Sequence, residues 1–427
     1  MTGGRIVAAL MIAGCAVSAT TARIPAAGPA LSSLVPHDVD TAGIPRTAEA
    51  MDAAFADFSW RSFVALTWPA LADGTPDPRR TIGRNGDAPA VFERFTMAED
   101  VFPAPPAVPA PWGSPPRIPA ACAGATRVVS MITKAPATPG GVVREFAQAL
   151  HTGPLIDQNR RYVRYAVQLN RDAFDFIVGN QLYDAARQDV KDAIVFPSGA
   201  LDGRVGAITT KAAWKVLGAG DDRTRFHRLS AWVYTPAGEG VRESCTKQEL
   251  GLVGLHIAHK TASRPQWIWS TFEQVDNVPP DNARTRATFF NPACSGSCEP
   301  NRLAPTPWDP SRPGTPTQVT RLNPLTPAPK AANPVWQAAL RAVDARSPWP
   351  HYMLVDTQWP TQPELTDENG RPRPSIVANA VIETFVQNSD RGCIFCHRGA
   401  SVVGSATTSD YSYLLLRANH ASGTSRR

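Results

Sequence analysis

The residues of this chain with the clearest chemistry are two cysteines and a histidine, close to the end of its 427 residues. Cys393 and Cys396 are two residues apart and His397 follows directly, which spells C-x-x-C-H. This spacing is typical of haem c attachment, because two thiols so placed reach the two vinyl groups of a porphyrin and the histidine reaches the iron. We therefore expect one covalent haem c, with thioether bonds to both cysteines and His397 as the proximal iron ligand.

A thioredoxin-like redox pair has the same cysteine spacing, but it begins a helix that follows a strand in a βαβ unit. No such pattern surrounds residue 393. The motif therefore favours haem attachment over thiol–disulfide exchange.

The sixth iron ligand is not evident from the sequence. No methionine follows His397, and His420 is the only histidine downstream of it. The upstream side chains able to complete the coordination are His227, His256, His259 and Met353. His256 and His259 are three residues apart in an expected strand, so they point to opposite faces and at most one readily points inward. We favour an open or water-bound position on the iron, which suits ligand binding or activation, whereas six-coordinate iron chiefly transfers electrons.

An open iron requires a nearby group that handles protons. The stretch that follows the second of these histidines supplies polar and aromatic candidates: His259, Trp267, Trp269, Glu273 and Asp276. Glu273 is the candidate general base and His259 the second catalytic candidate. The chain has no Ser-His-Asp spacing, phosphate-binding loop or H-E-x-x-H motif, which argues against hydrolase chemistry.

The first 19 residues are typical of an export signal. Arg5 precedes an apolar run at residues 6–13, which is too short to span a bilayer. The small residues at 17–19 fit a cleavage site, whereas residues 12–15 resemble a lipobox that would leave Cys15 lipidated. We expect an exported protein in the periplasm or on the outer surface. Under the lipobox alternative a lipid anchor at Cys15 would be its only membrane contact, and under the cleavage alternative it would have none. Residues 20–46, rich in Ala, Pro and Ser, are expected to form a flexible tether.

The other cysteines fit an oxidising compartment. Four of the seven lie outside the signal and the motif: Cys122, Cys245, Cys294 and Cys298. An even number of this kind predicts two disulfides, with three connectivities open. A metal site at residues 294–298 is the alternative, but no histidine lies nearby.

The charge distribution indicates which partners to expect. The chain has 43 basic and 37 acidic residues, a net charge of +6, and its arginines are scattered. Nucleic-acid binding requires a clustered basic patch, so we expect none. A redox partner protein and a small-molecule substrate are the expected partners.

The expected fold is α+β: an antiparallel sheet or half-barrel that carries the haem, with flanking helices and long Pro-rich loops. Residues 47–190 are helical or mixed, residues 191–427 are β-rich, and the two segments are expected to form one continuous unit. Helices are expected at 47–66, 141–150, 171–190, 333–343 (with Asn333 as its cap) and 375–388 (with Ser375 as its cap). Strands are expected at 161–170, 193–199, 205–217, 225–235, 250–261, 266–275 and 351–360. Residues 101–120 and 277–334 are expected to be loops.

Two stretches carry a family resemblance. "CIFCHRGASVVGSATTSDYSYLL" (393–415) resembles the ending of beta-type cytochrome c-prime and of its hydroxylamine-oxidising relatives, in which a lysine is cross-linked to the haem. "FPSGALDGRVGAITTKAAW" (196–214) is similar to their glycine turn and lysine-bearing strand. The resemblance implies a β-rich half-barrel, a five-coordinate haem and Lys211 as the haem-linked lysine. With "DFSWRSFVALTWP" (57–69), "GLHIAHKT" (254–261) and "VDTQWP" (355–360), the whole chain also resembles a broad set of large bacterial proteins known only as cytochrome c family.

These observations predict an exported mono-haem c-type cytochrome that performs one-electron redox chemistry. Oxidation of a small substrate or ligand binding at an open iron would make it a haem-dependent oxidoreductase or a ligand-binding protein. The alternatives are a periplasmic electron carrier with six-coordinate haem and a binding protein in which the haem is structural.

Overall fold

The structure is a computed structural model of the full chain. It describes residues 1, 28–83, 88–125, 128–129, 148, 152–188, 193–235, 237, 242–280, 283–296, 298–309, 311–366, 369–388 and 392–420. The predicted export signal except Met1, with its Cys15, and all of the predicted helix 141–150 except Gln148 lie outside these residues. None of the described helices is both long and apolar enough to cross a membrane.

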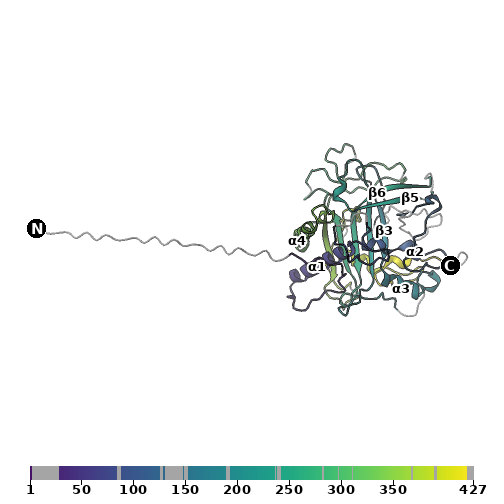
Figure 1. The fold of residues 1–427 in the computed structure, drawn as a ribbon, viewed down its shortest axis with the longest axis horizontal. Coiled ribbons are helices and arrows are strands. Elements are labelled where there is room, and N and C mark those ends of the chain that lie inside the picture. Colours follow the sequence, from purple (N-terminus) through teal and green to yellow (C-terminus); the bar gives the residue numbers. More distant parts are fainter. Residues whose placement is uncertain are drawn as a thin grey trace.

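A single nine-stranded sheet forms the centre of the protein (Figure 1). Its strands are β1 (Thr96–Met97), β2 (Val128–Val129), β3 (Arg164–Leu169), β4 (Ile208–Val216), β5 (Arg228–Thr235), β6 (Ser244–His259), β7 (Ile268–Gln274), β8 (Tyr352–Pro360) and β9 (Pro372–Arg373). Their order is β1-β3-β4-β6-β7-β8-β9, and β5 pairs with the first half of β6. All pairings are antiparallel except that between β2 and β5. The α+β class with an antiparallel sheet is confirmed, and the sheet combines strands from both predicted segments.

The helices are α1 (Ala48–Leu66), α2 (Ala98–Val101), α3 (Arg171–Gly179), α4 (Pro327–Val343) and α5 (Cys393–Arg398). Short 3-10 helices lie at Val91–Arg94, Ala120–Cys122, Ala185–Arg187, Arg223–Arg225, Trp349–His351 and Tyr413–Arg417. The predicted helix at 47–66 is confirmed, and the Thr47 hydroxyl caps it by accepting a hydrogen bond from the amide of Ala50 at 3.3 Å.

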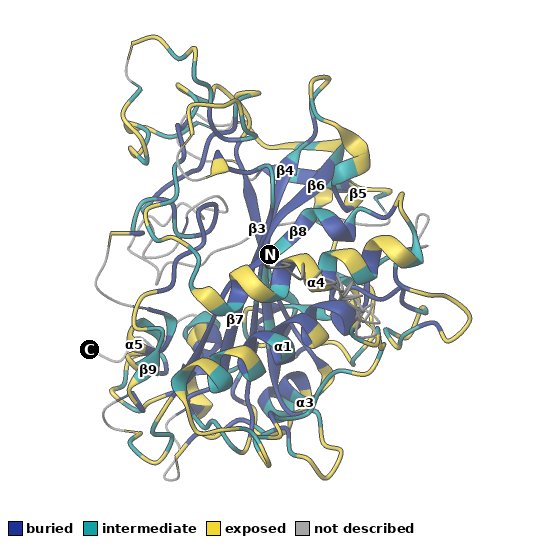
Figure 2. Cartoon of the chain, turned by 90° about the vertical axis from the view of Figure 1, so that its left-hand side faces the viewer, coloured by how far each residue is buried: buried dark blue, intermediate teal, exposed yellow. Residues whose placement is uncertain are grey.

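Two of these helices, α1 and α4, cover one face of the sheet (Figure 2). Aromatic side chains fill the space between them and the strands. Phe63 of α1 stacks on Phe272 of β7 with ring centroids 4.4 Å apart, and Trp60 stacks on Trp336 of α4 at 5.9 Å. Burial of such large apolar surfaces is the main favourable contribution to folding, so this face is a closed hydrophobic core.

The opposite face of the sheet is covered mainly by irregular chain. Residues 375–388 were expected to form a helix, but they form successive turns. The Asn379 amide donates to the hydroxyl of Thr271 at 2.9 Å and to the carbonyl of Phe272 at 3.0 Å, and the apolar side chains of Val381 and Ile382 are fully buried. Contacts with the sheet therefore replace helical hydrogen bonds in this segment.

Several other boundaries differ from the expectation. Residues 193–199 are not a strand, and the amide of Phe196 donates to the Asp410 carboxylate at 2.8 Å instead of to a neighbouring strand. The helix expected at 171–190 ends at Gly179, since Gln181 adopts a φ of 56°. The helix expected to start at Asn333 starts at Pro327. The Asn333 side chain instead accepts a hydrogen bond from the Trp60 indole at 3.1 Å.

Two disulfides join the four remaining cysteines, as predicted. Cys122 pairs with Cys245, and Cys294 pairs with Cys298. The first links the 3-10 helix Ala120–Cys122, which follows the Pro-rich loop, to β6, and the second closes a short loop within residues 277–334.

Residues 28–46 belong to the segment predicted as a tether. In this part of the chain Val39 is buried, and the Asp38 carboxylate accepts hydrogen bonds from the backbone and the hydroxyl of Ser263 at 2.9 and 2.5 Å. The described part of the segment therefore packs on the folded body.

Candidate functional site

The motif cysteines and histidine lie on α5, a helix of six residues. Its start is fixed by Gln358 of β8, whose side-chain oxygen accepts a hydrogen bond from the Ile394 amide at 2.8 Å. Ile394 is fully buried. A β-carbon on Gly392 would lie 2.0 Å from the Gln358 side chain, so only glycine fits there without displacing Gln358. The sheet thus positions the helix that carries the motif.

The imidazole of His397 is held in one orientation. Its Nδ1 lies 2.8 Å from the carbonyl oxygen of Tyr411, and its ring lies 4.2 Å from that of Trp269 and 5.1 Å from that of Tyr413. A carbonyl only accepts, so Nδ1 carries the proton and Nε2 keeps its lone pair. Burial lowers the pKa of His397 to about 4, which keeps the ring neutral. A neutral imidazole with a lone pair on Nε2 is the form that binds a metal ion.

The two motif cysteines are half-buried and do not form a disulfide with each other. The Tyr413 hydroxyl donates to the backbone carbonyl of Cys396 at 2.8 Å. Burial raises the pKa of the Cys393 thiol, so it is protonated at neutral pH.

Three ionisable side chains of the opposite face lie close enough to His397 to affect its pKa: Lys211, His256 and Glu383. Lys211 of β4 and His256 of β6 are directly paired across the two strands, and the Nε2 of His256 lies 3.3 Å from the Glu383 carboxylate. Burial opposes ionisation of Glu383, but His256 and Lys211 outweigh it and hold its pKa below the ordinary value. All three influence the pKa of His397 through their charges. The structure therefore brings Lys211 and His256 to the motif, as neighbours of Glu383.

The half-buried Lys211 lies in apolar and aromatic surroundings. Its ammonium group is 5.2 Å from the ring centre of Tyr165, and burial lowers the pKa of Lys211. The Tyr165 hydroxyl is occupied, since it donates to the carbonyl of Val381 at 2.8 Å.

The structure does not bring His259 to this site. It points to the helix-covered face of the sheet, where its ring lies 5.5 Å from that of Phe58 and its Nε2 lies 2.6 Å from the carbonyl of Val205. Burial lowers its pKa to about 4. His259 is thus a neutral residue of the hydrophobic core.

Glu273 is committed to an ion pair. Its carboxylate receives two hydrogen bonds from Arg321, at 2.7 and 3.2 Å, and one from the Ala380 amide at 2.7 Å, and its side chain is fully buried.

Met353 of β8, a candidate for the sixth iron ligand, is paired with Glu273 across the strands. The fourth ligand candidate, His227, is buried, and its Nε2 forms a hydrogen bond with the Glu93 carboxylate.

Sequence reasoning missed Glu383 and Tyr411. Glu383 lies in the segment expected to be a helix, 127 positions after the histidine that it contacts, and nothing near it marks a functional residue. Tyr411 acts through its backbone carbonyl, which any residue possesses. Of the two aromatic rings that lie against His397, Trp269 is among the candidates named from the sequence and Tyr413 is not.

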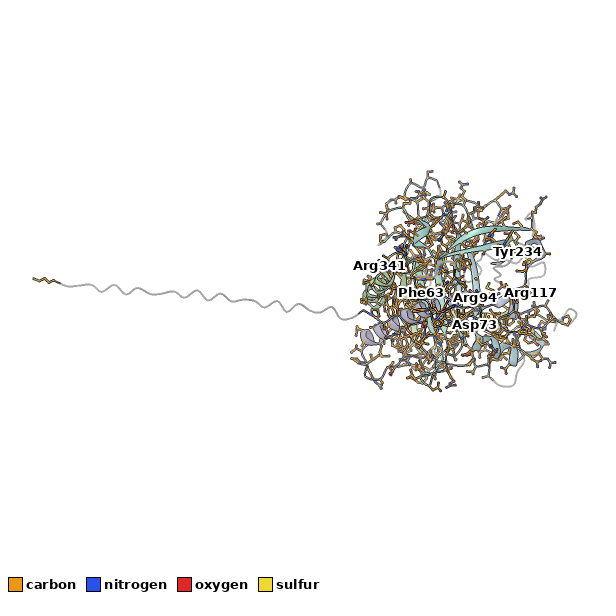
Figure 3. All side chains as sticks on the ribbon, viewed as in Figure 1. Phe63, Asp73, Arg94, Arg117, Tyr234 and Arg341 are labelled. Carbon is orange, nitrogen blue, oxygen red and sulfur yellow. A yellow bond between two sulfur atoms is a disulfide. The ribbon has the colours of Figure 1, made fainter. Side chains whose placement is uncertain are left out.

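A separate cavity of about 450 Å³ lies elsewhere in the described part of the protein. Its lining includes Asp73, Arg94 and Arg117, which are labelled in Figure 3. It also includes Ala166 and Gln168 of β3, which flank Val167, the partner of Lys211. Successive side chains of a strand point to opposite faces, so this cavity is on the other side of the sheet from Lys211.

No protein-family model, no curated protein and no solved structure matched this chain. The interpretation of the site therefore rests on its own residues.

Proposed function

We propose that Cys393, Cys396 and His397 attach one haem c and that the protein performs one-electron redox chemistry at this haem as an exported cytochrome. The observation that carries the proposal is the state of His397. Its Nδ1 is bound to the Tyr411 carbonyl, its Nε2 has no hydrogen-bond partner among the described residues, and both thiols lie on the same short helix. When bound, haem c supplies an iron that exchanges one electron between its ferrous and ferric states.

These residues fit such a group. The thiols are not consumed by a disulfide, and the ring nitrogen opposite the Tyr411 carbonyl is the one that faces a metal in haem proteins. Trp269 and Tyr413 restrain the imidazole plane from two sides.

The nearby side chains favour an iron with an open coordination position over one with a sixth ligand from the protein. The Nε2 of His256 has no accessible surface and lies 3.3 Å from Glu383, so it is directed at a carboxylate and not into open space. His259 is on the other face, and Glu273 is neutralised by Arg321. A small molecule that binds or reacts at the iron would then meet Lys211, His256 and Glu383 as its polar neighbours.

Lys211 is the candidate for direct contact with the haem, as the family resemblance implies. Its burial beside His256 supports this assignment. Mass spectrometry of tryptic peptides tests it: a cross-link would leave the haem bound to both the Cys393–Cys396 peptide and a Lys211 peptide, and K211A would release the second.

The test of the whole proposal is an optical spectrum of protein produced in a periplasm with haem-attachment machinery. It is recorded oxidised, reduced, and reduced under carbon monoxide. Covalent haem in the wild type and its loss in C393A/C396A would support the proposal. An open iron gives a high-spin spectrum that shifts at once with carbon monoxide. A low-spin spectrum indifferent to carbon monoxide would instead indicate an electron carrier, and H256A would then show whether His256 is its sixth ligand.

Location and partners are part of the same proposal. We expect the mature protein in the periplasm or on the outer surface, with a redox protein as its electron partner. Cell fractionation and the mass of the mature N-terminus distinguish cleavage near residue 19 from lipidation of Cys15.

A further inference from the structure

The carbonyl that binds His397 belongs to a tight turn with an unusual backbone. The Ser412 amide donates to the carbonyl of Ser409 at 3.0 Å, which closes a β-turn whose central residues are Asp410 and Tyr411. Both central residues have positive φ angles, 51° and 62°. Positive φ at both positions is characteristic of type I′ turns, which favour Asn-Gly or Asp-Gly. A tyrosine in this conformation is unfavourable, so other contacts must stabilise the turn.

A buried ion pair supplies those contacts. The Asp410 carboxylate lies 2.6 Å from the ammonium group of Lys260, and it also accepts a hydrogen bond from the Phe196 amide at 2.8 Å. The same ammonium group donates to the carbonyl of Pro265 at 2.7 Å. The two charged side chains are only 3% and 8% exposed. Lys260 directly follows the last residue of β6, so the pair ties the turn to the end of the central strand.

We propose that Lys260 and Asp410 are positioning residues that hold the Tyr411 carbonyl against Nδ1 of His397 and thereby fix the orientation and basicity of the proximal imidazole. This inference rests on the proposed function. Its basis is a continuous chain of contacts: Lys260 to the Asp410 carboxylate, Asp410 to the next residue of the turn, and the Tyr411 carbonyl to His397.

The energetics support a role in positioning more than one in stability. A buried ion pair is costly to desolvate, and an apolar replacement of similar size is often as stable. What the pair provides here is geometry, because a buried aspartate with two fixed partners restricts the conformation of the turn. A hydrogen bond from Nδ1–H to a carbonyl makes an imidazole a stronger donor to a metal, which stabilises the ferric state.

The chain offers a matched control for the experiment. Lys215 and Asp221 form a second buried Lys–Asp pair, 2.5 Å apart with side chains 1% and 11% exposed, and Asp157 lies 3.7 Å from the same ammonium group. Neither Lys215 nor Asp221 is among the groups that affect the pKa of His397. D410N and D221N each remove one buried carboxylate charge while keeping the side-chain size. Both should lose stability, so unfolding alone does not distinguish the two roles.

The readout is the midpoint potential of the holoprotein. We expect D410N to raise it, D221N to leave it unchanged, and K260R, which keeps the positive charge beside Asp410, to stay near the wild type. An unchanged potential in D410N, or an equal shift in D221N, would overturn the inference. Should D410N fail to fold, K260M takes its place. The midpoint potential should then rise in K260M and stay near the wild type in K260R, and equal potentials in the two variants would overturn the inference.

A second measurement is independent of haem attachment. In full-length protein with ¹⁵N-labelled histidine, the His397 ring should be the Nδ1–H tautomer in the wild type, and a mixture of tautomers in D410N. Tautomers identical in both would overturn the positioning role. Absence of covalent haem from the wild type would refute the proposed function but leave this comparison intact.

Discussion

The buried ion pair between Glu273 and Arg321 allows a test of whether Glu273 has a structural or a catalytic role. The Glu273 side chain is fully buried and that of Arg321 is 10% exposed, and they share two hydrogen bonds. The substitution E273Q keeps the shape and can still accept from the Ala380 amide, but it leaves the arginine charge buried without a counterion. Removal of one partner from such a pair costs about 3–5 kcal/mol. This is a large part of the roughly 5–15 kcal/mol by which native proteins are stable.

Urea unfolding followed by tryptophan fluorescence measures this loss. A double-mutant cycle with E273L, R321L and the double variant isolates the pair, and we expect the double variant to be more stable than E273L alone, because no unpaired charge remains. A loss below about 1 kcal/mol in E273Q, together with altered ligand binding in the holoprotein, would refute this reasoning. It would return Glu273 to the role of general base.

Two further predictions concern stability. The chain-entropy relation assigns about 5 kcal/mol to the Cys122–Cys245 disulfide, which spans 123 residues, and about 2 kcal/mol to Cys294–Cys298, which spans 4. In urea unfolding C122A/C245A should therefore lose clearly more stability than C294A/C298A, and equal losses would contradict the prediction. His259 stays neutral in the native state down to pH about 4, whereas the unfolded chain binds a proton below about pH 6.5. Stability should thus fall by about 3 kcal/mol through this residue as the pH drops across that window, and H259Q should show a shallower fall in unfolding measured at several pH values. An identical pH dependence in H259Q would show that other groups cause it.

The sheet was largely predictable from the sequence because its strands follow local rules. Six of the seven expected strands coincide with β3 to β8, because β-branched and aromatic runs bounded by turn residues favour a strand through their local preferences. The prediction of the seventh strand, 193–199, is wrong because of a contact distant in sequence: the Phe196 amide donates a hydrogen bond to Asp410, which lies 214 positions away. The helix expected at 375–388 fails similarly, because Asn379 bonds to the backbone and side chains of β7.

The site was predictable only in part, and the limit has a physical cause. Cys393, Cys396 and His397 are recognisable because the porphyrin imposes their spacing on consecutive residues. The opposite faces assigned to His256 and His259 follow from strand alternation, and the structure confirms that the two differ in this way. The periodicity does not reveal which of the two faces the motif covers. That depends on where residues 392–420 pack, and hence on contacts such as that between Ile394 and Gln358.

The helix that carries the motif is too short to be stable without the rest of the fold. Six residues are too few for a stable helix in water, since isolated helices need about 12–15. Among the described residues, α5 is held by contacts from other segments: Gln358 of β8 at its start, Trp269 of β7 against its histidine, and the turn at Tyr411 bonded to the same histidine. The strands that supply the first two precede the motif in the chain. We infer that C-x-x-C-H acquires its geometry only when the sheet is already formed, and that the chain following the motif completes the support of His397.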